Sequence, residues 1–238
     1  MLQVESVHVA IQSVQVLRGL SLQVDTGRMV GLVGRNGAGK TTLIRTLMGH
    51  LAPSQGRIVF DGQDLGKLPP HARAALGIGY MPEDRGLVPE LTVEENILVP
   101  VWVNKTLKEG ERLALVYRVL PELLEMRGRK ALLLSGGQQK LVALARALAV
   151  GTRLLLLDEP FEGLSPAVIP LIARGVASIR AMGKGVLIAE SNVHHIPDYV
   201  DRIYVLERGE VMFSGTLAQA HRDRDVMRVI AGQIEAAS

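Results

Sequence analysis

Short apolar segments alternate along the chain with longer segments in which apolar residues recur at helical spacing. The short segments have the length and the β-branched content of strands. We expect strands at 2–9, 14–24, 29–33, 57–60, 77–81, 154–157, 186–189, 202–207 and 210–213. The segments 154–157 and 186–189 contain no polar residue, which is typical of parallel strands buried on both faces.

The segments with helical spacing lie between these strands. We expect helices from about residue 40 to 48, at 69–76, after Thr92, at 107–120, 138–150 and 166–182, and from about 223. Thr92 and Glu95 form the capping box that marks a helix start. Strands that alternate with helices predict an α/β fold with a mostly parallel sheet, preceded by antiparallel N-terminal strands.

This order of elements also predicts how the chain is organised. We expect one domain over 1–238, in which residues 1–82 and 151–238 form a core lobe. Residues 83–150 are mostly helical and form an inserted subdomain that interrupts this lobe.

Composition narrows the possible functions. Of the 238 residues 47% are apolar but only 3% are aromatic, so Leu, Val, Ile and Ala must build the core. Without cysteine there are no disulfides or thiolate metal sites, which suits a cytosolic protein. We see no signal-peptide pattern, and no apolar run approaches the ~18 residues of a membrane span. The net charge is +3, and the basic residues are scattered along the chain. The densest basic cluster, at 221–225, is interleaved with acidic residues, which favours a solvated helix start over a nucleic-acid site.

The stretch GRNGAGKT, residues 34–41, fits the phosphate-binding pattern G-x-x-x-x-G-K-[ST] and stands between an apolar strand and a helix. Its glycines let backbone N–H groups face a phosphate, and the helix adds its positive end. We expect Lys40 to reach the β- and γ-phosphates and the Thr41 hydroxyl to hold Mg²⁺. The nucleotide-binding candidates here are Gly34, Arg35, Asn36, Gly37, Ala38, Gly39, Lys40, Thr41 and Thr42.

Two acids follow directly after the apolar strand 154–157. The carboxyl ends of parallel strands form the edge of a sheet where ligands bind. We therefore predict that Asp158 holds Mg²⁺, through water, and that Glu159 orients or deprotonates the attacking water. The alternative is a strand end with two solvated carboxylates, which the phosphate loop upstream disfavours.

The stretch LSGGQ, residues 134–138, predicts a second anion site. Two adjacent glycines at a helix start expose consecutive N–H groups, and a hydroxyl precedes them. The candidates are Ser135, Gly136, Gly137 and Gln138. One nucleotide cannot touch both this site and the phosphate loop in a monomer if the two lie on different lobes. Two chains arranged head to tail could each offer the site to the other's nucleotide.

Together, GRNGAGKT, LSGGQ and LLLLDEP resemble the ATP-binding cassette of ABC transporters, and the resemblance covers essentially the whole chain. It implies a P-loop ATPase that uses ATP and Mg²⁺, dimerises around two ATP molecules and drives a membrane permease. The stretches 80–83, 91–96 and 162–166 resemble the second of the two ATPases in importers for branched-chain amino acids, urea or amides.

This finer resemblance implies partners and a location. The partners are permease subunits, an identical or sister ATP-binding subunit and, indirectly, a solute-binding protein, with no nucleic acid. The location is peripheral, at the cytoplasmic face of the inner membrane. The groove around 83–101 is expected to receive a permease helix, with Leu87, Val88, Leu91 and residues 99–102 as its apolar surface. Trp102 is equally compatible with a place in the core.

Three positions depart from the general pattern of the family. No Tyr, Phe or Trp precedes the phosphate loop, and Ile11 stands where an adenine-stacking ring is usual. Glu83 replaces a frequent Gln and can still bind Mg²⁺ or water, as the subfamily commonly has Glu here. Ser191 stands at the position of the switch histidine and would reach a γ-phosphate only through water. His194 and His195 are interpreted as polar residues that open the next helix.

Two other classes of protein remain as alternatives. Non-transport ABC ATPases that act on nucleic acid or ribosomes usually resemble fused tandem cassettes, or carry coiled coils or zinc modules. This chain has one cassette, no heptad run and no cysteine. An adenylate-type kinase shares the phosphate loop but does not explain LSGGQ.

Overall fold

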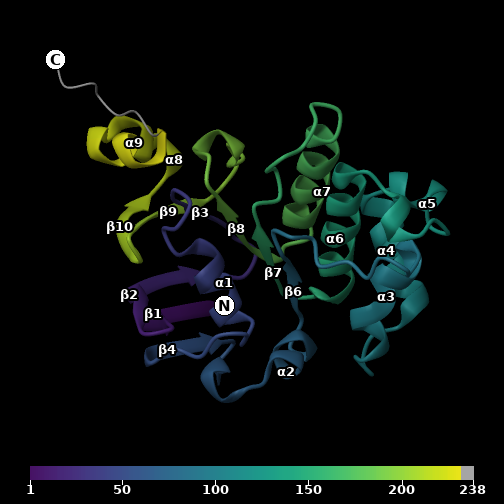
Figure 1. The fold of residues 1–238 in the computed structure, drawn as a ribbon, viewed down its shortest axis with the longest axis horizontal. Coiled ribbons are helices and arrows are strands. Elements are labelled where there is room, and N and C mark those ends of the chain that lie inside the picture. Colours follow the sequence, from purple (N-terminus) through teal and green to yellow (C-terminus); the bar gives the residue numbers. More distant parts are fainter. Residues whose placement is uncertain (232–238) are drawn as a thin grey trace.

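A six-stranded sheet runs through the middle of the molecule in a computed structural model that describes residues 1–231 (Figure 1). Its strand order is β10-β9-β3-β8-β7-β6, where β3, β6, β7, β8 and β9 are parallel and β10 is antiparallel to β9. The strands are β3 (Met29–Val33), β6 (Ile78–Met81), β7 (Leu154–Asp158), β8 (Gly185–Glu190), β9 (Arg202–Glu207) and β10 (Glu210–Gly215). Residues 232–238, the end of the predicted core lobe, lie outside the described residues.

A smaller antiparallel sheet, β2-β1-β4-β5, lies beside this central sheet. Its strands are β1 (Leu2–Ile11), β2 (Val14–Val24), β4 (Gln55–Phe60) and β5 (Gln63–Asp64). The predicted α/β fold with a mostly parallel sheet and antiparallel N-terminal strands is therefore confirmed.

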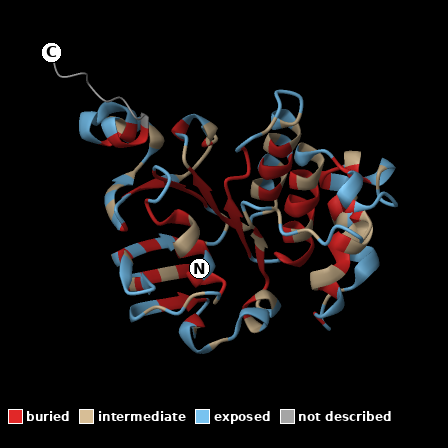
Figure 2. Cartoon of the chain, in the orientation of Figure 1, coloured by how far each residue is buried: buried red, intermediate tan, exposed pale blue. Residues whose placement is uncertain are grey.

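The central sheet is buried on both faces, and this explains its apolar strands (Figure 2). Successive side chains of a strand point to opposite faces. In β7, Leu154 and Leu156 join a core with β1, β2 and α1 (Lys40–Leu47), whereas Leu155 and Leu157 join a second core with the helices. A strand between two cores has no polar face, and only its ends can carry charged groups.

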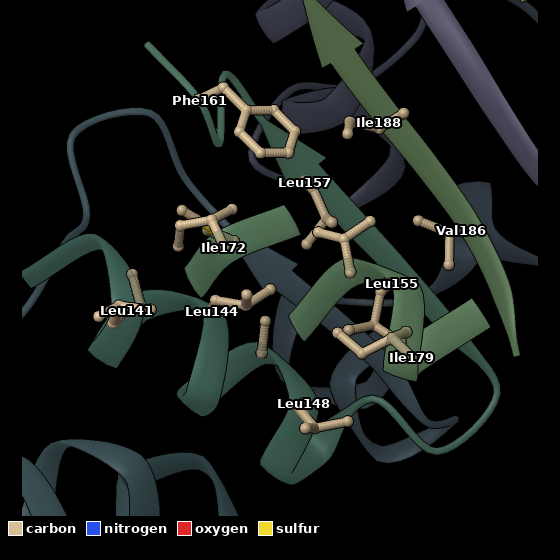
Figure 3. Close-up of a cluster of buried hydrophobic side chains, with 14 of the residues drawn as sticks. Leu141, Leu144, Leu148, Leu155, Leu157, Phe161, Ile172, Ile179, Val186 and Ile188 are labelled. Carbon is tan, nitrogen blue, oxygen red and sulfur yellow. The ribbon is translucent and has the colours of Figure 1, made fainter. Parts of the chain in front are cut away.

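The second core contains side chains of α3 (Val93–Trp102), α4 (Glu109–Val119), α5 (Glu122–Glu125), α6 (Gly136–Val150) and α7 (Ile169–Ala181). The C-terminal helices α8 (Leu217–Arg222) and α9 (Arg224–Ala231) also contribute to it. Figure 3 shows Leu144 and Leu148 of α6 and Ile179 of α7 packed around Leu155 of β7. The segment 83–150 is helical as expected. It shares one hydrophobic core with the central strands, and its description as a separate subdomain stays a prediction.

The observed bounds of some helices differ from the expected ones because capping and turn hydrogen bonds set where a helix begins. α6 begins at Gly136, not at 138, because Ser135 and Gln138 form a capping box. α7 begins at Ile169 rather than 166, because the amide of Val168 closes a turn onto Ser165 O. The short elements β5, α5 and α8 (Leu217–Arg222) were not predicted, because each has too few residues to show a hydrophobic periodicity. The helices α2 (Pro70–Ala75) and α9 (Arg224–Ala231) were predicted. Within residues 1–231, no helix is long and apolar enough to cross a bilayer.

The central packing yields a stability prediction. Leu155→Ala removes a fully buried side chain between β7 and α6, so we expect the free energy of unfolding to fall by about 2–5 kcal/mol. Leu132→Ala, which truncates a side chain that is 52% exposed, serves as the control and should stay within about 0.5 kcal/mol. Urea unfolding measures both, and equal losses would contradict this description of the core.

Candidate nucleotide-binding and catalytic site

The predicted phosphate loop, Gly34–Gly39, connects the carboxyl end of β3 to the start of α1. Gly39 caps α1 with φ +112°, and a Cβ there would lie 2.8 Å from Leu17 Cδ2, so only glycine fits. Gly37 also has a positive φ, +84°. No acidic residue occupies the first turn of α1, so its positive end is available to an anion.

Lys40 meets the two other predicted catalytic residues at this edge of the sheet. Its ammonium group is buried and donates to Gly34 O at 2.7 Å and to Ser191 Oγ at 3.0 Å. It also lies 3.2 Å from Glu159 Oε1. The sequence separates Lys40 from Ser191 by 151 positions, and parallel pairing of β3 with β8 brings them together.

Glu159 has a strained backbone, with φ +48°. Such a conformation costs about 1–3 kcal/mol and persists where the surroundings impose it. Here the Glu159 amide donates to Ala189 O at 2.9 Å, and the buried Lys140 donates to the Glu159 carbonyl at 2.5 Å and to Glu162 O at 2.6 Å. These contacts hold the backbone of Glu159 in place directly after β7.

The same surroundings keep the Glu159 carboxyl ionised. Burial by itself raises its pKa, but hydrogen bonds from the Ser191 hydroxyl and amide, with Lys40 nearby, hold the pKa below its ordinary value. A general base must be deprotonated before it acts. The geometry and the charge of Glu159 both fit the role of base.

Ser191 contacts the predicted base directly. Its hydroxyl lies against Glu159 Oε1 and 2.6 Å from Asn36 Oδ1 in the phosphate loop, and one O–H can donate to only one of them at a time. Whether Ser191 also acts on a phosphate through water stays a prediction. In this structure it orients Glu159.

The three predicted metal ligands line one cavity of about 710 Å³. Thr41 Oγ1 donates to Asp158 Oδ1 at 3.2 Å, and Asp158 Oδ2 is buried with no hydrogen-bond partner among residues 1–231. Burial raises the pKa of Asp158 to about 7, and Glu83 adds to the rise. A divalent cation satisfies an orphaned buried carboxylate oxygen, so these residues fit Mg²⁺.

The predicted ligand set is small for a metal site. In the described part of the chain, no three His, Cys, Asp or Glu side chains are grouped in a way that could hold an ion. One hydroxyl and two carboxylates leave positions for water and phosphate oxygens, which is how Mg²⁺ usually binds.

The LSGGQ stretch lies apart from this cavity. It begins α6, which packs on the opposite face of the central sheet from α1. Ser135 is exposed, and its side chain accepts from the Gln138 amide. A Cβ on Gly137 would lie 2.7 Å from Val168 Cγ2, so that glycine is also needed for helix packing. Ser135, Gly136, Gly137 and Gln138 are absent from the residues that line the cavity of Thr41 and Asp158.

Ile11 ends β1 in the turn of the β1–β2 hairpin and is 39% exposed. That position leaves it open to a ligand, and its contact with adenine stays a prediction. The expectation that His194 and His195 open a helix is wrong. They end a single 3-10 turn, Val193–His195, and His195 Nδ1 lies 3.1 Å from Oε2 of the buried Glu190.

Sequence reasoning missed two buried charged residues near Glu159. Lys140 contacts the Glu159 carbonyl, and Glu190 ends β8 one residue before Ser191. The signal for Glu190 was the same as for Asp158, a charged residue at the end of an apolar strand. Lys140 gave a weaker signal, a lone cation at the start of a long apolar helix face.

A family model described as "ABC transporter" matches residues 17–162, which include both the phosphate loop and Glu159. The chain belongs to the ABC transporter family. It is an ATP-hydrolysing subunit of a transporter and uses ATP with Mg²⁺.

Curated relatives of this ABC ATPase match over nearly its whole length. The lipopolysaccharide export system ATP-binding protein LptB of Haemophilus influenzae is 36% identical over 98% of this chain and 97% of its own. LptB of Escherichia coli K12 is 35% identical over 92% of both chains. A probable ABC transporter ATP-binding protein of Azorhizobium caulinodans is 36% identical over 92% of this chain and 78% of its own.

Solved structures agree with the fold. A nucleotide-free ATP-binding cassette from an ABC transporter has a TM-score of 0.83 at 28% identity and covers 95% of this chain and 97% of its own. The ADP conformation of the ATP-binding cassette MJ1267 has the same score and identity, with 98% and 99% covered. The family prediction is thus confirmed, whereas these relatives do not support an amino-acid importer, because the LptB proteins are named for lipopolysaccharide export.

The position of Glu159 gives a test of the base. Glu159→Gln removes the carboxylate but keeps its size, so we expect ATP binding to persist and hydrolysis to slow by about 10²–10⁴-fold. With ATP the variant should accumulate as a dimer in size-exclusion chromatography. Glu210→Gln, on exposed β10, should hydrolyse at the original rate. Rapid turnover by Glu159→Gln would remove Glu159 from the role of base.

The missing ring gives a prediction about the nucleotide base. Without a stacking aromatic the adenine loses a contact worth about 0.5–1.5 kcal/mol, so GTP should bind within about tenfold of ATP. Ile11→Tyr should tighten ATP about threefold to tenfold, whereas Met212→Tyr, at a similarly exposed position on β10, should not. Equilibrium titrations measure both nucleotides. An ATP preference above about a hundredfold would mean that other residues read the adenine.

Proposed function

We propose that this ABC ATPase works as a dimer around two ATP molecules, with an identical or sister subunit, and drives a separate membrane permease from the cytoplasmic face of the membrane. ATP binding closes the dimer, and hydrolysis reopens it. Lys40 and the loop backbone hold the phosphates, Thr41, Asp158 and Glu83 hold Mg²⁺ and its waters, and Glu159 is the base.

One observation carries the dimer proposal. Lys40, Glu159 and Ser191 meet at one edge of the sheet, whereas Ser135 is exposed at the start of a helix on the other face. The N-terminal amides of this helix therefore have no nucleotide of their own chain to bind. A second chain in head-to-tail orientation places its nucleotide against them, and its own α6 binds the nucleotide of the first chain in the same way.

A surface for the permease lies near the start and the end of α3. Val88 is 40% exposed, Trp102 is 48% exposed and Val103 is 79% exposed, so the alternative in which Trp102 belongs to the core is wrong. Asn96 fixes the loop before α3 through three hydrogen bonds to the backbone of Val88 and Leu91. Leu87 packs against the core and Val101 is buried. Of the other expected residues, Leu91, Val99 and Pro100 are half-buried, so Val88, Trp102 and Val103 are the most exposed apolar side chains for a partner.

The cargo has two candidates with separate support. The names of the LptB relatives support export of lipopolysaccharide or a similar lipid. The stretches 80–83, 91–96 and 162–166 support import of a small solute such as a branched-chain amino acid, with a solute-binding protein.

Purification of the chain with its permease tests the transport role and the cargo together. The tagged chain is expressed with the genes beside its own, and the complex is reconstituted into vesicles. ATP hydrolysis stimulated by lipopolysaccharide supports export, and stimulation by a branched-chain amino acid with a solute-binding protein supports import. Failure of any membrane protein to copurify would contradict the transport role.

The exposed apolar residues give a prediction about docking. Val88→Ser and Trp102→Ser should weaken the complex with the permease, because each removes apolar contact at the interface, while basal ATP hydrolysis by the isolated chain persists. Val14→Ser, at an apolar position that is 65% exposed on the β1–β2 hairpin, is the control and should leave the complex intact. Copurification yield and basal turnover are the two measurements. Loss of basal turnover would assign Val88 and Trp102 to the fold instead.

A further inference from the structure

Lys140 is a buried lysine on the second turn of α6, and the proposed function gives it no role. It is 3% exposed. Its ammonium group donates to the carbonyl of Glu159 at 2.5 Å and to the carbonyl of Glu162 at 2.6 Å. Among residues 1–231 no salt bridge pairs it with a carboxylate. Both of its acceptors are therefore backbone oxygens of the segment that follows β7.

An apolar side chain would be easier to bury at the position of Lys140. A buried ammonium group costs free energy unless hydrogen bonds or an ion pair compensate for the lost water. The residues that follow on α6, Leu141, Val142 and Leu144, are apolar and pack into the core. The presence of a lysine is therefore explained by the contacts of its ammonium group and not by packing.

The two carbonyls belong to one tight turn, Glu159-Pro160-Phe161-Glu162. The Glu162 amide closes this turn onto Glu159 O at 3.3 Å. Its second position holds a proline, whose fixed φ favours that place in a turn. The Phe161 amide donates to Oε1 of Glu190, at the end of β8, at 3.0 Å. The turn is thus held from β8 through Phe161 and from α6 through both of its ends.

We propose that Lys140 is a positioning residue for hydrolysis, which ties the turn that begins with Glu159 to the start of α6 and so sets where the carboxylate of the base points. Glu159 has φ +48°, a conformation that persists only where the surroundings impose it. Without the two hydrogen bonds the turn relaxes and the carboxylate loses its aim, whereas the phosphate loop still binds the nucleotide. The helix that holds the base in place is also the helix whose exposed start faces the partner's nucleotide in the proposed dimer.

Steady-state kinetics separate positioning from nucleotide binding. Lys140→Met keeps the apolar stem but cannot donate, so kcat should fall by about 10–100-fold with KM for ATP unchanged. Lys140→Arg can donate to both carbonyls and should recover most of the loss; a variant as slow as Lys140→Met would contradict the proposal. Lys140 also lines the cavity of Thr41 and Asp158. A raised KM with kcat kept would mean that it contacts the nucleotide itself, which overturns the positioning role.

Lys184 offers a matched control. It lies directly before β8, at the opposite end of that strand from Glu190, and it also donates to two backbone carbonyls, Gly151 O at 2.7 Å and Thr152 O at 3.1 Å. Lys184→Met therefore removes the same kind of contact away from the site and should leave kcat unchanged. If it lowers kcat as much as Lys140→Met does, the loss reflects a general weakening of the fold and the proposal is overturned.

The inference rests on the proposed role of Glu159 as the base, and a double substitution tests the two separately. Glu159→Gln already lacks the base, so adding Lys140→Met should slow single-turnover hydrolysis little further. Independent contributions would instead multiply, and a second loss of about 10–100-fold would overturn the proposal. Rapid turnover by Glu159→Gln alone would contradict the assignment of the base, not the contact with Lys140.

Hydrogen exchange of the nucleotide-free protein gives a readout that does not depend on turnover. In Lys140→Met the amides of Phe161 and Glu162 should exchange faster, because the turn that contains them opens more often. In Lys184→Met they should exchange at the original rate. Unchanged exchange at both amides in Lys140→Met would overturn the proposal. If Lys140→Met does not fold, Lys140→Gln, with a shorter side chain, replaces it in both experiments with the same expected direction.

Discussion

The contact between Lys40 and Glu159 at 3.2 Å, with both side chains only 5% exposed, is the interaction on which the rest of the site depends. A buried charge without a partner is strongly disfavoured, so each of these two groups requires the other. Lys40 starts α1 after β3, and Glu159 follows β7, with β8 paired between the two strands. The parallel register of three strands therefore sets the position of the charges.

This arrangement also bears on the proposed role of Lys40 in phosphate binding. The ammonium group satisfies its donors with Gly34 O, Ser191 Oγ and Glu159, which are all within the site. In the proposed function, a triphosphate competes for these donors and brings negative charge next to Glu159. The hydrogen bonds from Ser191 to Glu159 then become more important, because they favour the ionised base independently of Lys40.

The two faces of the central sheet separate the two anion sites that the sequence predicts. α1 and the antiparallel sheet cover one face and carry the phosphate loop, whereas α6 and its neighbours cover the other and carry Ser135. Lys140 connects the helical face to the predicted catalytic edge of the sheet, because it extends from α6 to the carbonyl of Glu159. The start of α6 is thus connected directly to the backbone of Glu159.

The sequence by itself determined the fold class, most strands and helices, and the residue types of the nucleotide site. Those features depend on local signals: apolar strands buried on both faces, capping boxes and a glycine-rich loop of fixed spacing. Lys40, Thr41, Asp158 and Glu159 could be named because each follows directly on such a signal.

Only the tertiary structure decided which distant residues meet. Ser191 looked like a shortened switch residue, and it is a hydrogen-bond partner of Glu159. Glu190 carries the same local signal as Asp158, a charged residue at the end of an apolar strand, but its full burial and its contact with His195 depend on how β8 and the turn after it pack. Trp102 fitted both core and surface by its sequence, since an aromatic at a helix end has no local feature that fixes its exposure. Hydrophobic pattern and turn chemistry act over a few residues, whereas the charges of this site are balanced across strands that are more than a hundred positions apart.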